Sequence, residues 1–114
     1  MRTRHLVHNG RALPWKVRCC ETFLQRARGL IFAPQAERQW IWRLHPCNAV
    51  HTLFLAAPID VVFCNSAGEV LRIVAHLSAR RWAGQGAAVS VWEFPAGATA
   101  RLRLRRGDRL GLCD

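Results

Sequence analysis

One aspartate, Asp60, interrupts the longest apolar run of the chain, residues 51–70, and this most constrains the fold. Pro58 precedes a block of mainly β-branched and aromatic residues, and turn formers follow at 65–68. The pattern predicts a buried strand ending in a tight turn. Since side chains alternate along a strand, two faces are expected, one with Ile59, Val61 and Phe63 and the other with Asp60, Val62 and Cys64. Neither face is plainly polar, so we expect Asp60 to be at least partly buried.

Length and cysteine usage limit the class of protein. The chain has 114 residues, of which 51% are hydrophobic, so we expect one domain, residues 1–114, around one core. Its five cysteines are an odd number, and its N-terminus lacks the layout of a signal peptide. No apolar run reaches the ~20 residues that span a bilayer. These features predict a cytoplasmic protein with free thiols and no membrane span.

The net charge of +10 is compatible with phosphate, acidic lipid or acidic protein partners. Sixteen of the seventeen basic residues are arginine, however, and Lys16 is the one lysine. A GC-rich genome could produce this bias without any functional demand. The charge alone therefore does not identify a partner.

Periodicity and turn residues predict a mainly β (α+β) fold: a compact β-barrel-like domain of about seven strands with one or two short helices. An Asn-Gly pair at 9–10 predicts a hairpin. A helix is expected at 22–29, a surface loop at 80–86, and either a strand or a helix at 98–106. Strands are expected at 3–8, 12–19, 40–44, 59–64, 69–75, 89–94 and 109–113.

Several short motifs resemble the bacterial and archaeal family called domain of unknown function 192. The resemblance implies a small, mostly β, barrel-like domain, a helix at 98–104 and no known activity. Where relatives have methionine, this chain has Ile31 and Leu55, which weakens the case for a methionine-based metal site. The matching pieces, in order, are Arg26–Leu30, His51-Thr52, Pro58-Ile59-Asp60, Phe63, Gly68-Glu69-Val70, Trp92-Glu93, Pro95-Ala96-Gly97 and Gly107-Asp108.

Asp60 has two interpretations. Together with His51 and Thr52 it could form a functional cluster, because a carboxylate can orient an imidazole and make it a general base. Alternatively, Asp60 accepts backbone N–H groups across a turn and holds the barrel closed. The second carboxylate in an apolar setting, Glu93, is expected to pair with an arginine rather than to act as an acid catalyst.

Four residues have the composition of a zinc or copper site: His45, Cys47, His51 and Cys64. Their spacing matches no recognised ligand pattern, and cysteine is often buried for packing alone. We therefore predict no bound metal and no cofactor. A cysteine nucleophile paired with His51 lacks a specified third residue.

Two arginine-rich stretches could contact anions. Arg80-Arg81-Trp82 lies beside glycines and could stack on a base. The densest charge is a group predicted to form basic surface and an anion-binding site: Arg101, Arg103, Arg105, Arg106 and Arg109.

We thus expect a non-catalytic module that binds a small ligand or a protein through a surface near His51, Thr52, Asp60 and Glu93. A nucleic-acid or polyanion-binding protein is the alternative. An enzyme or metal site at His51 and Asp60 ranks third.

Overall fold

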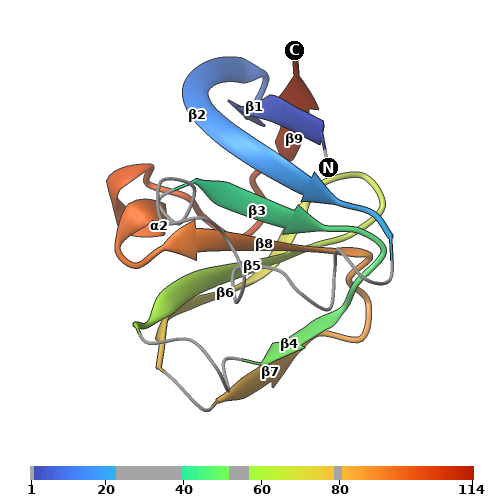
Figure 1. The fold of residues 1–114 in the computed structure, drawn as a ribbon. Helices are drawn as coiled ribbons and strands as arrows, with labels where there is room; N and C mark the ends of the chain where they lie inside the picture. The colour runs from blue at the N-terminus through green and yellow to red at the C-terminus, as the bar shows by residue number, and fades with distance from the viewer. Residues whose placement is uncertain (1, 23–39, 52–56, 79–80) are drawn as a thin grey trace.

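The computed structural model describes residues 2–22, 40–51, 57–78 and 81–114. Within these ranges the chain forms nine strands and one short helix (Figure 1). The elements are β1 (Arg2–His8), β2 (Arg11–Cys20), β3 (Ile41–Leu44), β4 (Ala49–His51), β5 (Ile59–Cys64), β6 (Val70–Leu77), β7 (Trp82–Gly84), β8 (Ser90–Pro95), α2 (Ala98–Arg101) and β9 (Leu110–Cys113).

Seven strands form one curled sheet in the order β6-β5-β8-β3-β2-β1-β9. Only the β2–β3 pair in this sheet is parallel. The curl brings the starts of the two edge strands, β6 and β9, together. Glu69 and Arg109 form an isolated antiparallel β-bridge between their backbones, and the Leu110 N–H donates to the Gly68 carbonyl at 2.9 Å. The result is a half-barrel, which confirms the predicted mainly β, barrel-like fold (Figure 1).

Gly68 makes this closure sterically feasible. Its φ is +78°, and a Cβ at this position would lie 2.5 Å from the Leu110 carbonyl oxygen. Only a residue without a side chain tolerates both conditions. The β5–β6 turn is therefore fixed against the start of β9.

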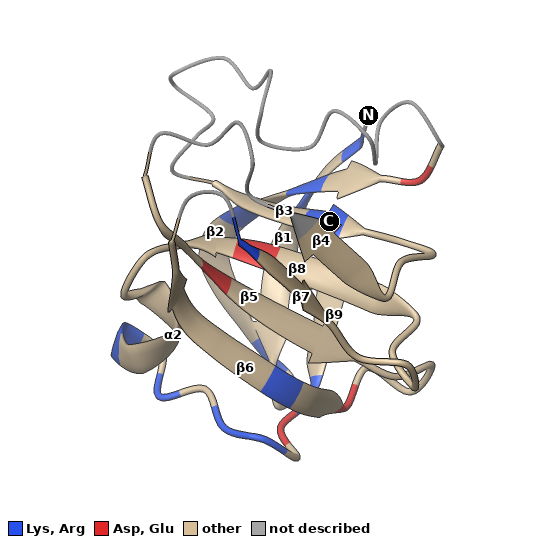
Figure 2. Cartoon of the chain, turned by 90° about the horizontal axis from the view of Figure 1, so that it is seen from below, with Lys and Arg blue, Asp and Glu red and all other residues tan. Residues whose placement is uncertain are grey.

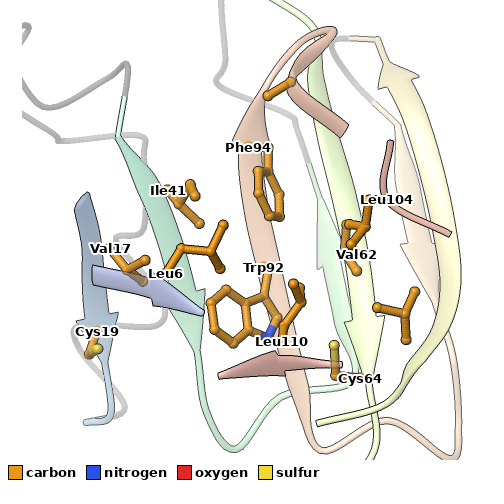
Figure 3. Packing of buried hydrophobic residues seen from close by; sticks show 12 residues of the cluster. Leu6, Val17, Cys19, Ile41, Val62, Cys64, Trp92, Phe94, Leu104 and Leu110 are labelled. Carbon is orange, nitrogen blue, oxygen red and sulfur yellow. The ribbon is translucent and has the colours of Figure 1, made fainter. Parts of the chain in front are cut away.

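The sheet has a core on each face. The inner core, inside the curl, draws on every strand of the seven-stranded sheet, with Trp92 and Phe94 among its largest members (Figure 3). The outer core includes Trp42 and Phe63 and is covered by the β4–β7 pair through Val50 and Ala83. Strand β5 is buried along its whole length because it contributes to both cores.

The alternation predicted for β5 is confirmed. Ile59, Val61 and Phe63 belong to the outer core, while Val62 and Cys64 belong to the inner core. Asp60 shares the inner side with Val62 and is completely buried. Truncating a side chain such as Phe94 to alanine would cost about 3–5 kcal/mol, as is usual for buried aromatic residues.

The predicted N-terminal hairpin is also confirmed. Asn9 and Gly10 have φ of +50° and +81°, as the Asn-Gly turn between β1 and β2 requires. Asn9 additionally docks the turn on the C-terminal segment, because its Oδ1 accepts the Arg109 N–H at 2.7 Å. A local turn signal therefore also contributes to a long-range contact.

The prediction of a surface loop at 80–86 is wrong for the middle of this segment. Residues 82–84 form β7, which pairs antiparallel with β4, a strand that the sequence pattern did not indicate. Each of these strands has three residues, too few for an alternating pattern. The two strands pair because Val50 and Ala83 are buried against the outer core, which residues far away in the sequence form, and not because of local strand propensity.

The ambiguous segment 98–106 contains the helix rather than a strand. It is a single turn, α2, that starts after Gly97 (φ +87°), and Arg103 soon follows with φ +53°. Nearly all of the helix predicted at 22–29 lies outside the described residues. No helix in the described part of the chain is long and apolar enough to cross a membrane.

Candidate functional site

Asp60 is the acceptor of four hydrogen bonds at one end of the inner core. Its Oδ1 accepts the His76 N–H at 2.9 Å. Its Oδ2 accepts the N–H groups of Gly97 and Thr99, both at 3.1 Å, and the Thr99 hydroxyl at 2.6 Å. This carboxylate therefore joins β5 to β6 and to the start of α2.

These donors also set the charge of Asp60. Burial acts to raise its pKa, but the hydrogen bonds from Thr99, His76 and Gly97 favour the ionised form and bring the pKa below its usual value. All four donors belong to the protein itself, three of them to its backbone. This is the arrangement that the structural interpretation of Asp60 requires.

Glu93 lies on the opposite face of the sheet from Asp60. It is opposite Val61 on β5 and Trp42 on β3, both members of the outer core, whereas Asp60 is opposite Phe94 of the inner core. Burial raises the pKa of Glu93 to about 7. No arginine within the described ranges forms an ion pair with it, so the predicted arginine partner is not found there.

The structure thus locates only part of the predicted cluster of His51, Thr52, Asp60 and Glu93. The two carboxylates of this cluster lie on opposite faces of the sheet. His51 belongs to β4, the strand that covers the outer core, but its side chain is not among the described groups. Thr52 lies outside the described residues. A role for His51 and Thr52 remains a prediction.

The two cysteines among the four weak metal candidates lie on opposite faces of the sheet. Cys64 belongs to the inner core, whereas Cys47 packs against the outer core and its thiol donates to the Ala49 carbonyl at 3.1 Å. His45 lies at a cleft described below. Among the side chains that the structure describes, which do not include that of His51, no group of three or more His, Cys, Asp or Glu residues could hold a metal ion.

A cleft of about 270 Å³ opens at the end of the inner core opposite Asp60. Along β5 and β8, Asp60 is opposite Phe94 at one end, and Cys64 is opposite Ser90 at the cleft end. None of the described residues that line the cleft is acidic. They are Arg4, Arg43, His45, Asn65, Ser66, Gly68, Val89, Ser90, Trp92, Leu110, Gly111 and Leu112.

Arg43 enters this cleft from the inward face of β3. In register it is opposite Cys19 and Trp92, both in the inner core, and its guanidinium lies 5.5 Å from the centre of the Trp92 ring. The Trp92 indole is itself held in place, since its N–H donates to the Ser90 hydroxyl at 3.1 Å. Among the described residues Arg43 has no acidic partner.

Arg4 adds a second guanidinium from β1, where it is opposite the inner-core residue Val17. Its Nε lies 3.0 Å from Oδ1 of Asp114, a side chain that is 96% exposed. This contact lacks hydrogen-bond geometry, and Nε is buried without a hydrogen-bond partner in the described part of the protein. An ion pair with so exposed a carboxylate contributes little and is readily exchanged for another anion.

The thiols beside the cleft are protonated at neutral pH. Burial raises the pKa of Cys64 to about 12, although the Arg43 charge and a hydrogen bond with Ser90 oppose the shift. The pKa of Cys19 is raised in the same way, again against Arg43. Since the thiolate is the nucleophile and the metal ligand, neither cysteine is suited to either role.

The five arginines of the C-terminal stretch are all exposed. Basic residues follow one another along the segment after α2 (Figure 2). Arg101 lies 5.8 Å from the centre of the Trp15 ring, and the Arg105 N–H donates to Asp108 at 2.9 Å. The stretch is basic surface, as predicted, but no described cavity encloses all five residues.

Sequence reasoning missed Thr99, Arg4 and Arg43. Arg43 could have been noticed, because it is the one charged residue in the apolar stretch 40–44 that was predicted as a strand. Thr99 and Arg4 had no comparable signal, since their importance depends on which strands become neighbours.

Comparison with known proteins agrees with the fold. The family model of domain of unknown function 192 (DUF192), described as "Uncharacterized ACR", matches residues 4–112. A UPF0127 protein of Pyrococcus furiosus is 33% identical over 107 residues, covering 91% of this chain and 92% of the relative. Another from Thermococcus sibiricus is 29% identical over 111 residues, covering 92% and 72%.

Two solved structures share the fold. A protein of unknown function from Novosphingobium aromaticivorans has a TM-score of 0.80 and 19% identity, covering 94% of this chain and 83% of that one. A Sinorhizobium meliloti protein, described provisionally as a transcription regulator, has a TM-score of 0.83 and 20% identity, covering 97% and 94%. The family match spans nearly the whole chain, and the chain therefore belongs to the uncharacterised DUF192 family.

Proposed function

We propose that this protein is a non-catalytic binding module that takes a small anionic ligand in the cleft at the open end of its inner core. The observation that carries the proposal is the pair of arginines, Arg4 and Arg43, that line a cleft whose other lining residues, in the part of the chain that the structure describes, include no acid. Elsewhere in the inner core a buried charge is matched by built-in partners, as at Asp60. At the cleft the matching charge would come from the ligand.

The chemistry of the lining favours a carboxylate or phosphate group. Guanidinium groups bind both kinds of oxyanion through paired N–H donors. Ser66, Ser90 and Asn65 add hydroxyl and amide groups at the same cleft. The volume of about 270 Å³ is at the small end for ligand pockets, so we expect a compact metabolite-sized anion rather than a dinucleotide.

The buried thiols and carboxylates of the sheet support binding without chemistry. Cys19 and Cys64 are held in the thiol form by burial, and Asp60 is committed to its four donors. Glu93 faces the other side of the sheet. These thiols and carboxylates therefore supply the cleft with no nucleophile or base. The cleft offers positive charge and hydrogen-bond donors, and His45 adds an imidazole to its described lining.

A thermal-unfolding screen at constant ionic strength tests the proposal. Phosphate, sulfate, citrate and succinate are compared with chloride, using the parent protein, Arg43→Gln and the matched variant Arg11→Gln, which removes an exposed charge from the start of β2. A ligand at about 100 times its Kd stabilises a fold by about 2.7 kcal/mol. We expect Arg43→Gln to lose most of the gain in Tm from the best anion, and Arg11→Gln to keep it.

Arg43→Lys sharpens the result, because it keeps the charge but removes the paired donors. We expect it to retain only part of the gain. If the parent and Arg43→Gln gain equally from every anion, the effect is the general stabilisation by excluded salts, and the proposed site is refuted.

A further inference from the structure

Trp82, on β7, is unusually exposed for its size. The residue is 71% exposed, and it is the one large hydrophobic residue so exposed among those that the structure describes. Strand alternation explains its direction, since Ala83 points into the outer core while Trp82 and Gly84 occupy the other side of β7. A single exposed apolar residue is not unusual in itself, so its surroundings decide its significance.

The indole rests on a floor of small residues. A Cβ on Gly84 would lie 3.0 Å from Cη2 and 3.2 Å from Cζ2 of Trp82, and 3.4 Å from Cβ of Ala49 on the neighbouring strand. Glycine at this position therefore lets the ring lie along the strand, with the rest of its surface open to solvent. The combination of Trp82, Gly84 and Ala49 forms a flat aromatic surface, here called the β7 platform.

The surroundings of the β7 platform are basic. Arg72, exposed on the edge strand β6, donates from Nη1 to the Gly84 carbonyl at 2.8 Å, which anchors its guanidinium beside the platform. Arg81 precedes Trp82 and is also exposed. Strands β4, β6 and β7 contain no aspartate or glutamate. The platform therefore complements a negatively charged partner that also offers flat rings.

We infer that the β7 platform binds single-stranded nucleic acid, with a base stacked on Trp82 and a backbone phosphate beside Arg72. Aromatic stacking combined with basic side chains is the usual way of holding unpaired bases without sequence preference. Arg72 can serve a phosphate while holding Gly84, because a guanidinium has five N–H donors. A duplex hides the faces of its bases and would contact the platform only through phosphates.

Charge also argues against a second copy of the chain as the occupant. Another copy would bring a further net charge of +10 to an already basic surface. A stable protein interface usually buries about 1,200 Å² or more in total, and Trp82 is the only large exposed hydrophobic side chain in the described ranges. A polyanion removes the repulsion and needs a much smaller apolar contact.

Fluorescence anisotropy with a labelled oligothymidine of about 12 nucleotides tests the inference. We expect the parent to bind it at low salt and to bind a duplex of equal length more weakly. Trp82→Ala should lower affinity about tenfold or more, and Trp82→Phe should restore most of it. Arg72→Gln should reduce the slope of log affinity against log salt by about 0.7, while Arg11→Gln leaves affinity within about twofold.

Three results would overturn the inference. The first is equal affinity of Trp82→Ala and the parent, which would leave only general charge attraction. The second is equal binding of duplex and single strand. The third is concentration-dependent self-association in sedimentation that Trp82→Ala abolishes, which would assign the platform to a second copy. Arg43→Gln should bind the oligonucleotide as the parent does, so this result is separable from that of the anion cleft.

Discussion

The two ends of the inner core differ in how their charged side chains are partnered. At one end Asp60 is completely buried, yet four donors of the chain satisfy it. At the other end Arg4 and Arg43 line an open cleft, with only the exposed Asp114 as an acidic partner within the described ranges. A charge satisfied within the protein stabilises the fold, whereas one left for solvent or a ligand is available for binding.

The largest change in stability is expected at the Asp60 end of the inner core. Asp60→Ala should lower the free energy of unfolding by about 3 kcal/mol or more, because it leaves several buried donors without an acceptor. Thr99→Val removes one hydroxyl that donates to an ionised carboxylate and should cost about 1.5–3 kcal/mol. Urea unfolding followed by circular dichroism measures both. An Asp60→Ala variant as stable as the parent would contradict a structural role.

The same end gives a dependence on pH. The pKa of Asp60 is lowered by folding, so its contribution to stability is complete above the ordinary value of 3.8 and is lost as the pH falls through the lower folded pKa. Asp60→Asn should therefore flatten the loss of stability in acid. If the parent and Asp60→Asn lose stability in parallel below pH 4, the hydrogen bonds do not select the ionised form.

Glu93 should make stability depend on pH in the opposite direction. Its pKa is raised from 4.5 to about 7, so the folded protein holds a proton that the unfolded chain has released, and stability declines as the pH rises across that interval. Glu93→Gln should remove this decline and be more stable than the parent by about 3 kcal/mol at pH 8. Urea unfolding at pH 5 and 8 measures it, and equal declines in both proteins would contradict the burial of a protonated carboxyl.

The smallest effect is expected from the exposed arginines at 101–109. Changing Arg103, Arg105 and Arg106 to glutamine relieves mutual repulsion at a solvated surface, so stability should change by less than about 1 kcal/mol. We expect this variant to keep most of the Tm gain from phosphate that Arg43→Gln loses. If the triple variant loses it instead, the anion site belongs to the C-terminal stretch, as the sequence alone suggested.

The contrast between the two ends also explains what could be predicted. Alternation in β5 indicated a carboxylate inside a core, and the Asn-Gly turn indicated the first hairpin, because both signals are local. The donors to Asp60 come from His76, Gly97 and Thr99, at least 16 positions away. Arg4 and Arg43 line one cleft because β2 pairs with both β1 and β3, and the curl of the sheet brings the start of β9 against the β5–β6 turn. Contacts between distant strands produce no periodic pattern in the sequence from which they could be predicted.

Glu93 illustrates the same limit. The sequence indicated that it and Asp60 were unusual, and grouped them as one site. The register of β5 against β8 places them on opposite faces, because Asp60 is opposite Phe94 and Glu93 is opposite Val61. A shift of one residue would have put them together, and nothing local distinguishes the two registers.

An NMR titration with the best anion of the thermal screen tests the central claim most directly. Backbone amide signals are followed at both ends of the inner core: Gly68, Ser90 and Gly111 at the cleft, and Gly97 and Thr99 at Asp60. The account predicts saturable shifts at the cleft that Arg43→Gln abolishes, with the amides at Asp60 unmoved. Shifts confined to residues 101–109, or shifts that grow without saturation, would contradict it.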